Sequence, residues 1–302
     1  MFTPYTHTPK RILKSGQISI ASFIGDETNA DRKTIASFGE EWKAFHQFSE
    51  DDLKQAGNEY FDIVTDEMLN QNTTVLDVGC GSGRWSYFIA DKVKNIEAID
   101  PSDAVYSAAQ LLASKRNVRV THASTDTIPF DNNSFDFVLC LGVLHHIPDT
   151  QKALSDAVSK LKTGGYALLY FYYNLENRSA LYRALFAVVD LNRRVISRMP
   201  NALKRFCCDA IALVVYMPLV AIARCMKSIA PKSNEWQKIP LSYYCNKSFH
   251  IMRNDALDRF GTPLEKRFSR QQIEAMMKEA GLDEIVFSDM QPYWHCAGRK
   301  ST

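Results

Sequence analysis

The sequence predicts an α/β fold: a doubly wound, mostly parallel sheet of seven strands with a helical insertion near the C-terminal end. Three observations favour it. Apolar, β-branched runs alternate with helical stretches between residues 73 and 173. The first of these runs ends in a glycine-rich turn. The alternation stops at residue 174 and resumes near residue 269. Strands that alternate with helices in this way form parallel sheets covered on both faces.

Residues 1–49 are expected to form an N-terminal arm and a helix. The first 35 or so residues show no clear period, and Trp42, Phe45 and Phe48 then follow at helical spacing. Another helix is expected from about Glu50 to Leu69. Two interpretations of Trp42 and Phe45 are open: they close over a bound ligand, or they pack in the core.

Residues 50–173 contain the alternating elements and are expected to form the binding core. Ser102 is a suitable N-cap for the helix that follows it, and Gly164 and Gly165 are expected to stop the last helix. Strands are expected over 73–79, 95–100, 117–123, 135–142 and 166–173, with helices over 84–93, 102–116 and 150–162.

Residues 174–255 are expected to form the insertion, which is mostly helical, apolar and basic. Residues 178–232 contain ten lysines and arginines but two aspartates, which gives this segment a net charge of about +8. The whole chain has a net charge of only +2. Residues 256–302 are expected to complete the sheet with a helix over 269–281 and strands over 283–289 and 293–300.

Composition limits the class of protein. A chain of 302 residues with 46% hydrophobic and 23% charged residues is an ordinary globular chain. Its seven cysteines show no C-x-x-C spacing, which argues against disulfides and against a metal site and favours the reducing cytoplasm. No signal peptide is expected. The longest charge-free apolar run, 210–223, is short for a span of ~20 residues and favours a buried or interfacial helix.

The glycine loop "VLDVGCGSGRWS" follows the first predicted strand of the core and opens a helix. Such a loop lets the backbone approach a nucleotide-like ligand. A dinucleotide site favours the pattern G-x-G-x-x-G, but here the glycines are Gly79, Gly81 and Gly83, and Arg84 takes the place of the third dinucleotide glycine. Asp77 would place a carboxylate where a cationic ligand group, and not a pyrophosphate, is favoured.

On these residues the chain resembles the class I S-adenosylmethionine-dependent methyltransferases, a Rossmann-like family, and within it the group related to ubiquinone and menaquinone methyltransferases. The resemblance covers roughly residues 70–172 through "VLDVGCGSG", "EAIDPS" and "IPFDNNSFDFVLCLGVLHHIPD". It implies S-adenosylmethionine as cofactor, ribose binding by Asp100, and a final antiparallel strand near residues 293–300. The implied cofactor-binding residues are Asp77, Gly79, Cys80, Gly81, Gly83, Asp100, Pro101, Ser124, Thr125, Leu141 and Gly142.

One position departs from the family. An acidic residue usually stands five positions before the proline of the "LPF" stretch and contacts adenine, but Ser124 stands there, five positions before Pro129. Asp126 could substitute if the loop shifts, or it is a solvated turn residue. Cys80 is expected to be a small loop filler.

His146 and His145 are the candidate catalytic bases, because they follow the predicted strand 135–142 at the edge where such folds place ligands. The alternative is that they serve packing and loop hydrogen bonding. The expected acceptor is a small or lipid-linked molecule, such as a glycan or metabolite, methylated on oxygen or nitrogen. Nucleic acid is not expected, since the insertion is too apolar for a phosphate-binding face.

The insertion suggests two further roles. It could form a lid over the acceptor site, or its basic and apolar segment 178–232 could contact an anionic membrane surface at the inner face of the membrane. Candidate acceptor residues follow it: Tyr243, Tyr244, His250, Arg253 and Arg259. A competing interpretation is a protein that binds the cofactor, has lost catalysis and serves regulation or membrane-surface interaction.

Overall fold

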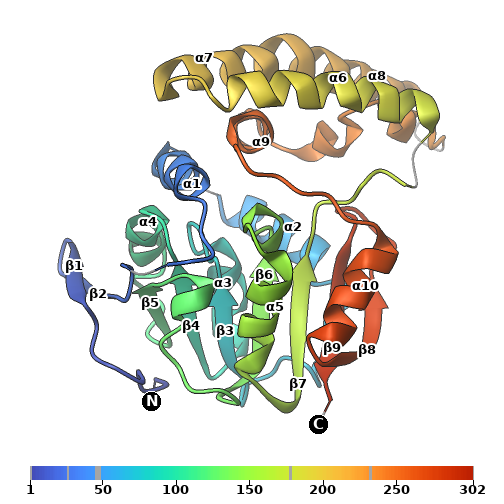
Figure 1. Ribbon diagram of the computed structural model, residues 1–302. Coiled ribbons are helices and arrows are strands. Elements are labelled where there is room, and N and C mark those ends of the chain that lie inside the picture. Colours follow the sequence, from blue (N-terminus) through green and yellow to red (C-terminus); the bar gives the residue numbers. More distant parts are fainter. Residues whose placement is uncertain (1, 26, 45–48, 177–178, 231–232, 302) are drawn as a thin grey trace. The chain divides into compact units, whose positions relative to one another are not determined.

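A nine-stranded sheet organises the computed structural model, which describes residues 2–25, 27–44, 49–176, 179–230 and 233–301 (Figure 1). Its strand order is β1-β2-β5-β4-β3-β6-β7-β9-β8. The strands are β1 (Arg11–Ser15), β2 (Ile18–Ser22), β3 (Thr74–Val78), β4 (Asn95–Asp100), β5 (Val118–His122), β6 (Phe135–Leu141), β7 (Leu161–Tyr170), β8 (Leu282–Phe287) and β9 (His295–Lys300).

The predicted doubly wound plan is confirmed in the seven strands β3 to β9. The five strands β3 to β7 pair in parallel, whereas β9 pairs antiparallel with β7 and β8 pairs antiparallel with β9. The glycine loop therefore leaves β3 in the middle of the sheet, between β4 and β6. That position is where parallel sheets bind ligands, at the carboxyl ends of the strands.

Two strands were not predicted. Residues 11–22, expected to be part of a structureless arm, form the antiparallel hairpin β1–β2, and β2 adds to β5 through Ala21 and Ser22. The two-residue turn begins at Gly16, whose φ of +59° suits a tight hairpin. The seven-stranded prediction is therefore corrected to nine strands by an edge hairpin.

Helices cover both faces of the sheet, and alternate residues of β3 show this. Val75 packs with α3 and α4, whereas Leu76 packs with α5 and α10. The helices of this part of the chain are α1 (Arg32–Ala44), α2 (Glu50–Tyr60), α3 (Arg84–Ile89), α4 (Ala104–Leu111), α5 (Thr150–Ser159) and α10 (Arg270–Glu279). Of the aromatic residues assigned to the first helix, Phe45 and Phe48 lie outside the described residues.

Several predicted boundaries were wrong. The helix expected to reach Leu69 ends at Tyr60. Helix α5 ends at Ser159, and Gly164 and Gly165 lie inside β7 instead of stopping the helix. A Cβ on Gly165 would lie 2.8 Å from the carbonyl oxygen of Asp136, so glycine is required there by the close approach of β6.

The chain divides into two compact units, one of residues 1–177 and 264–302 and the other of residues 178–263. Unit 2 contains α6 (Ala180–Ile196), α7 (Asn201–Ile211), the π-helical turn η4 (Ala212–Tyr216), α8 (Met217–Ile229) and α9 (Phe249–Gly261). The expected boundary at residue 255 falls inside α9. That helix continues because Ala256, Leu257 and Phe260 are buried in the core of unit 2.

One helix, Asn201–Ile229, is long and apolar enough to cross a membrane by length and composition. It has 29 residues, its most apolar 18-residue window has a mean hydropathy of 2.2, and 28% of that window is buried in the structure.

Candidate active site

The glycine loop after β3 has the geometry of a ligand-binding turn. Gly79, Gly81 and Gly83 have φ values of +73°, +55° and +84°, which favour glycine. A Cβ on Gly79 would lie 2.4 Å from Val143 Cγ2, so this glycine also permits the close approach of the loop after β6. The amides of Gly79 and Cys80 both donate to the carbonyl of Ile99, at 2.8 and 2.9 Å, and fix the loop against β4.

Asp100 lies at the end of β4 and points at this loop. Its Oδ2 accepts the Gly81 amide at 2.9 Å, and its Oδ1 accepts the amide and hydroxyl of Ser102 at 2.8 and 2.6 Å. Burial raises the pKa of this carboxyl, against the lowering effect of these hydrogen bonds. Behind the Asp100 carboxyl, His122 Nε2 donates to the carbonyl of Pro101 at 3.0 Å. This bond fixes the backbone directly after Asp100.

Asp77 is the most unusual group of the loop. It is fully buried, and its Oδ2 accepts the Ser86 hydroxyl at 2.7 Å. Its Oδ1 is buried and has no hydrogen-bond partner among the described residues. Burial raises the pKa of this carboxyl to about 7. A buried carboxylate oxygen without a donor is costly, and a donor on a bound ligand would remove the cost.

Helix α1 covers the loop. The indole of Trp42 lies beside Gly81, where a Cβ would be 3.1 Å from Trp42 Nε1. The guanidinium of Arg84 lies 5.2 Å from the ring centre of Trp42 and 4.4 Å from that of Trp85. Phe38, on the same helix, meets His146 edge-on at 4.9 Å. Trp42 therefore lies beside the glycine loop, the position that one of its two interpretations, closure over a bound ligand, requires.

The loop after β5 is held internally. Ser124 caps a short 3₁₀ turn (Thr125–Thr127), and its hydroxyl donates to Asp126 Oδ1 at 2.6 Å. Asp126 Oδ2 accepts the amides of Thr28 and Asn29 at 2.7 and 3.0 Å. These bonds outweigh burial and lower the pKa of Asp126. Asp126 is thus neither a solvated turn residue nor a free substitute for an adenine ligand, because it holds the N-terminal segment.

Sequence reasoning missed an aromatic cluster at the ends of β6 and β7. Gly142 follows Leu141 with a φ of +80°, and a Cβ there would lie 3.8 Å from the ring of Tyr170. Tyr170 packs at 5.1 Å against Tyr60 and at 5.8 Å against Tyr172. The run "YFYY" after β7 carried a signal, since alternate residues of a strand end share one side.

Comparisons with known proteins agree with this arrangement. Residues 76–169 match the family described as "Methyltransferase domain". The chain carries a class I S-adenosylmethionine-dependent methyltransferase domain.

Two relatives illustrate the match. An uncharacterized methyltransferase of Mycobacterium tuberculosis is 35% identical over 109 residues, which cover 36% of this chain and 55% of that protein. A demethylmenaquinone methyltransferase of Staphylococcus aureus is 32% identical over 107 residues, 34% of this chain and 44% of that protein. The chain therefore spans about half the length of the relatives it matches.

The fold is shared more widely. A chain from the complex between the Haloferax volcanii Trm112 methyltransferase activator and a methyltransferase is similar with a TM-score of 0.50. It is 14% identical, and the match covers 90% of this chain and 99% of that one. At this identity the likeness shows the fold.

The loop residues of the methyltransferase domain fit its cofactor, S-adenosylmethionine. The unpartnered Asp77 Oδ1 suits the ammonium of its methionine part, and the positive φ values of Gly79, Gly81 and Gly83 make the tight turn that follows β3. Ser102 and Gly81 hold the Asp100 carboxyl at the end of β4, where it would bind the ribose hydroxyls of the cofactor. Burial raises the pKa of the Cys80 thiol well above its usual value, so Cys80 stays a neutral loop filler.

The two histidines differ in the structure. His145 is fully buried, its ring stacks on Tyr172 at 3.9 Å, and its Nδ1 accepts the Tyr172 amide at 3.4 Å. Burial, then His146 and Arg267, holds its pKa well below the usual range. His146 Nδ1 instead donates to the carbonyl of Leu264 at 2.7 Å. That bond leaves Nε2 as the nitrogen with a lone pair, the state that a general base needs.

The five acceptor candidates lie in unit 2, and Arg253, Tyr244 and Tyr243 make contacts within it. Arg253 donates to both oxygens of Asp209, at 2.8 and 2.7 Å, and ties α9 to α7. Tyr244 donates to Asp255 at 2.8 Å. Tyr243 faces the ammonium of Lys247 at 4.3 Å. These bonds stabilise unit 2 itself, and a role in binding the acceptor stays a prediction for these three residues, His250 and Arg259.

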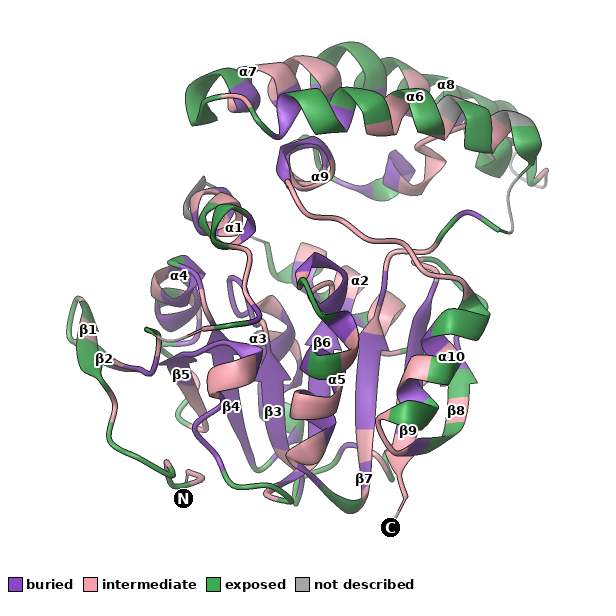
Figure 2. Cartoon of the chain, viewed as in Figure 1, coloured by how far each residue is buried: buried purple, intermediate pink, exposed green. Residues whose placement is uncertain are grey.

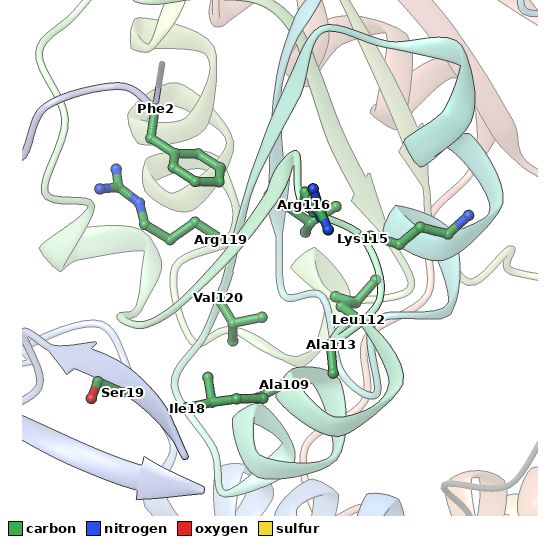
Figure 3. A pocket seen from close by; sticks show the side chains of 11 residues that line it. Phe2, Ile18, Ser19, Ala109, Leu112, Ala113, Lys115, Arg116, Arg119 and Val120 are labelled. Atoms are coloured by element: carbon green, nitrogen blue, oxygen red, sulfur yellow. The ribbon is translucent and has the colours of Figure 1, made fainter. Parts of the chain in front are cut away.

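A pocket of about 220 Å³ lies elsewhere on unit 1 (Figure 3). It is lined from the N-terminus, the start of β2, the end of α4 and the start of β5, for example by Phe2, Ala109 and Arg119. Because it lies at the amino end of β5, it is at the edge of the sheet opposite to Asp100 and the glycine loop. Its size is also below that of usual small-molecule sites.

Proposed function

We propose that this protein transfers a methyl group from S-adenosylmethionine to an oxygen, or alternatively a nitrogen, of a small or lipid-linked acceptor such as a glycan or metabolite. The observation that carries the proposal is the buried Asp77 Oδ1 without a partner beside the glycine loop. When bound, the cofactor supplies an electrophilic methyl carbon on its sulfonium. The protein must then align a nucleophile and exclude water.

The chain's own residues support these tasks. Tyr60, Tyr170 and Tyr172 form an aromatic wall at the carboxyl ends of the strands, and such rings suit an apolar or planar acceptor. His146, oriented by Leu264, would take the proton of an acceptor hydroxyl on Nε2 as the oxygen forms its bond to carbon. A relative named for demethylmenaquinone is consistent with a small, lipid-like acceptor.

The test is an acceptor screen that measures S-adenosylhomocysteine release from the purified protein with hydroxylated small molecules, lipid-linked sugars and total lipid extract. We expect release with at least one class. Asp100→Ala should abolish it through cofactor binding. His146→Ala should lower turnover about 100-fold and leave cofactor affinity unchanged, as for a lost general base.

One result would contradict the proposal, and another would change only the role of His146. Tight cofactor binding without release on any acceptor would favour the interpretation of a catalytically inactive binding protein. If His146→Ala turned over as fast as the wild-type protein at every pH, the proposal of methyl transfer would stand, but His146 would be assigned to packing. A matched control is His7→Ala, which changes an exposed histidine of the N-terminal segment.

A further inference from the structure

One side of unit 2 is covered with exposed apolar residues. We call it the outer face, and it is formed by α6 and the long helix Asn201–Ile229 (Figure 2). Phe206 is 70% exposed, Val214 69% and Leu191 64%. The other large members are Val188, Val195, Leu203, Leu213, Met217, Ile222 and Ile229. Soluble proteins rarely expose so many large apolar side chains in one place without a partner.

The outer face is surplus to the packing of unit 2. The long helix already buries a second stripe, at intervals of three or four residues, against the other elements of its unit. That stripe consists of Cys208, Ala212, Tyr216, Val220 and Ala223. Two segments of the long helix, α7 and η4, contact α9. Its third segment, α8, contacts the 3₁₀ turn η6 (Ser242–Asn246). The outer face therefore has a role other than holding the unit together.

Charges border the outer face without interrupting it. The residues from Ala210 to Ala223 are all uncharged. At one end Asp209 is bound by Arg253, and at the other Arg224 donates to the carbonyls of Cys245 and Lys247. The acidic residues of the described part of 179–230 are Asp190 and Asp209, and both are in ion pairs.

Exposed arginines follow one edge of the apolar stripe on α6. Val188, Leu191 and Val195 share a helical face. Arg198 and Arg194, which is also in an ion pair with Asp190, share the adjacent one. Arg183 continues the same row, eleven residues before Arg194. A wide apolar face with a row of arginines along its border is complementary to acyl chains and anionic head groups.

We propose that the outer face of unit 2 binds the surface of an anionic lipid bilayer, with its helices lying in the plane of the interface. The uncharged stretch favours lying over spanning, because 14 residues rise only about 21 Å, against ~30 Å of hydrocarbon. The arginine row favours lipid over a second apolar protein surface. This inference does not depend on methyl transfer. Membrane binding would bring the protein to the surface that holds a lipid-linked acceptor.

Vesicle sedimentation tests the proposal on the full chain. Wild-type protein should bind vesicles in which roughly a third of the lipid is phosphatidylglycerol, and should bind pure phosphatidylcholine far less. The double variant Leu213→Glu/Val214→Glu should lower binding about tenfold or more, because it places charges where acyl chains would lie. Arg183→Gln/Arg198→Gln should lower it about fivefold for each charge removed, at low salt only.

A matched control carries the same change on unit 1. Ile12→Glu/Met290→Glu alters two apolar residues that are 51% and 66% exposed and should leave vesicle binding unchanged. Cofactor affinity is measured on every variant to test that the fold is intact, because cofactor binding does not require a membrane.

Three results would overturn the proposal. One is that the wild-type protein binds neither vesicle type. Another is that the control Ile12→Glu/Met290→Glu loses as much binding as Leu213→Glu/Val214→Glu. Alternatively, sedimentation velocity would show a wild-type dimer that Leu213→Glu/Val214→Glu dissociates, without vesicle binding. That result would assign the outer face to self-association.

Discussion

At the scale of single residues, Asp100 makes the clearest prediction. Its carboxylate is held by Ser102 and Gly81 at the carboxyl end of β4, where we expect it to bind the ribose hydroxyls. Asp100→Asn replaces one acceptor oxygen by a donor and removes the charge, so cofactor affinity should fall about 10- to 100-fold, as expected for the loss of charge-assisted hydrogen bonds. Isothermal titration measures it. Asp103→Asn, an exposed neighbour, is the control, and equal affinities in both variants would remove Asp100 from the site.

Asp77 predicts a pH dependence of binding. Its pKa of about 7 means that half of the free protein carries a neutral Asp77 at pH 7 and about nine-tenths at pH 6. A cationic ligand binds the ionised form, so affinity for S-adenosylmethionine should rise about fivefold from pH 6 to pH 7 as protons leave. Titrations at the two pH values measure it. Asp77→Asn should abolish the dependence, and a dependence that survives in this variant would exclude Asp77 as its cause.

At the scale of elements, the N-terminal segment before α1 is held by two loops. Asp126 accepts from Thr28 and Asn29, and the side chain of Asn29 exchanges two hydrogen bonds with the backbone of Asp149, at 2.8 and 2.7 Å. The segment therefore bridges the loops that follow β5 and β6, beside the cofactor edge. Helix α1, which carries Trp42 to the glycine loop, starts directly after it.

Removal of this clamp should loosen the segment. In Asp126→Ala, hydrogen exchange at the amides of Thr28 and Asn29 should accelerate about tenfold, because local opening no longer breaks a charge-assisted bond. Amides of β3 should not change. Asp131→Ala, an exposed acid in the same loop, is the control. Unchanged exchange at Thr28 and Asn29 would mean that Asn29 alone holds the segment.

The sequence predicted those elements whose pattern matched their burial. All six residues of β4 are buried, and its bounds, 95–100, were predicted without error. The β1–β2 hairpin was missed because β1 is an exposed edge strand whose Ile12 is 51% exposed, so no apolar period marks that strand. Gly164 and Gly165 suggested a helix end. Gly165 is instead required by the close approach of β6, and Gly164 has a φ of +80°, and no local pattern shows either cause.

The same reason limits the prediction of the site. The glycine loop, Asp77 and Asp100 are close together in sequence and carry a motif. The contacts of His146 with Leu264 and of Asp126 with Thr28 join residues about a hundred positions apart. Which ring nitrogen of His146 carries the proton is decided by the distant carbonyl of Leu264. A single sequence does not contain that information in any local pattern.

At the scale of the whole molecule, the two units have separate buried cores. Unit 1 buries the sheet, and unit 2 buries Tyr216, Tyr244 and Met252 among its own helices. A ligand stabilises the part of a protein that must be folded to bind it, by about 2.7 kcal/mol at a concentration of 100 times its Kd. With S-adenosylhomocysteine at that concentration, exchange of the slowest amides of β3 and β4 should slow about 100-fold.

The response of unit 2 distinguishes two arrangements. If the units unfold separately, amides of α7 and α9 should keep their exchange rates when the ligand is added, and this is the result we expect. Protection of α9 by the same factor as β3 would instead show that the two units unfold together.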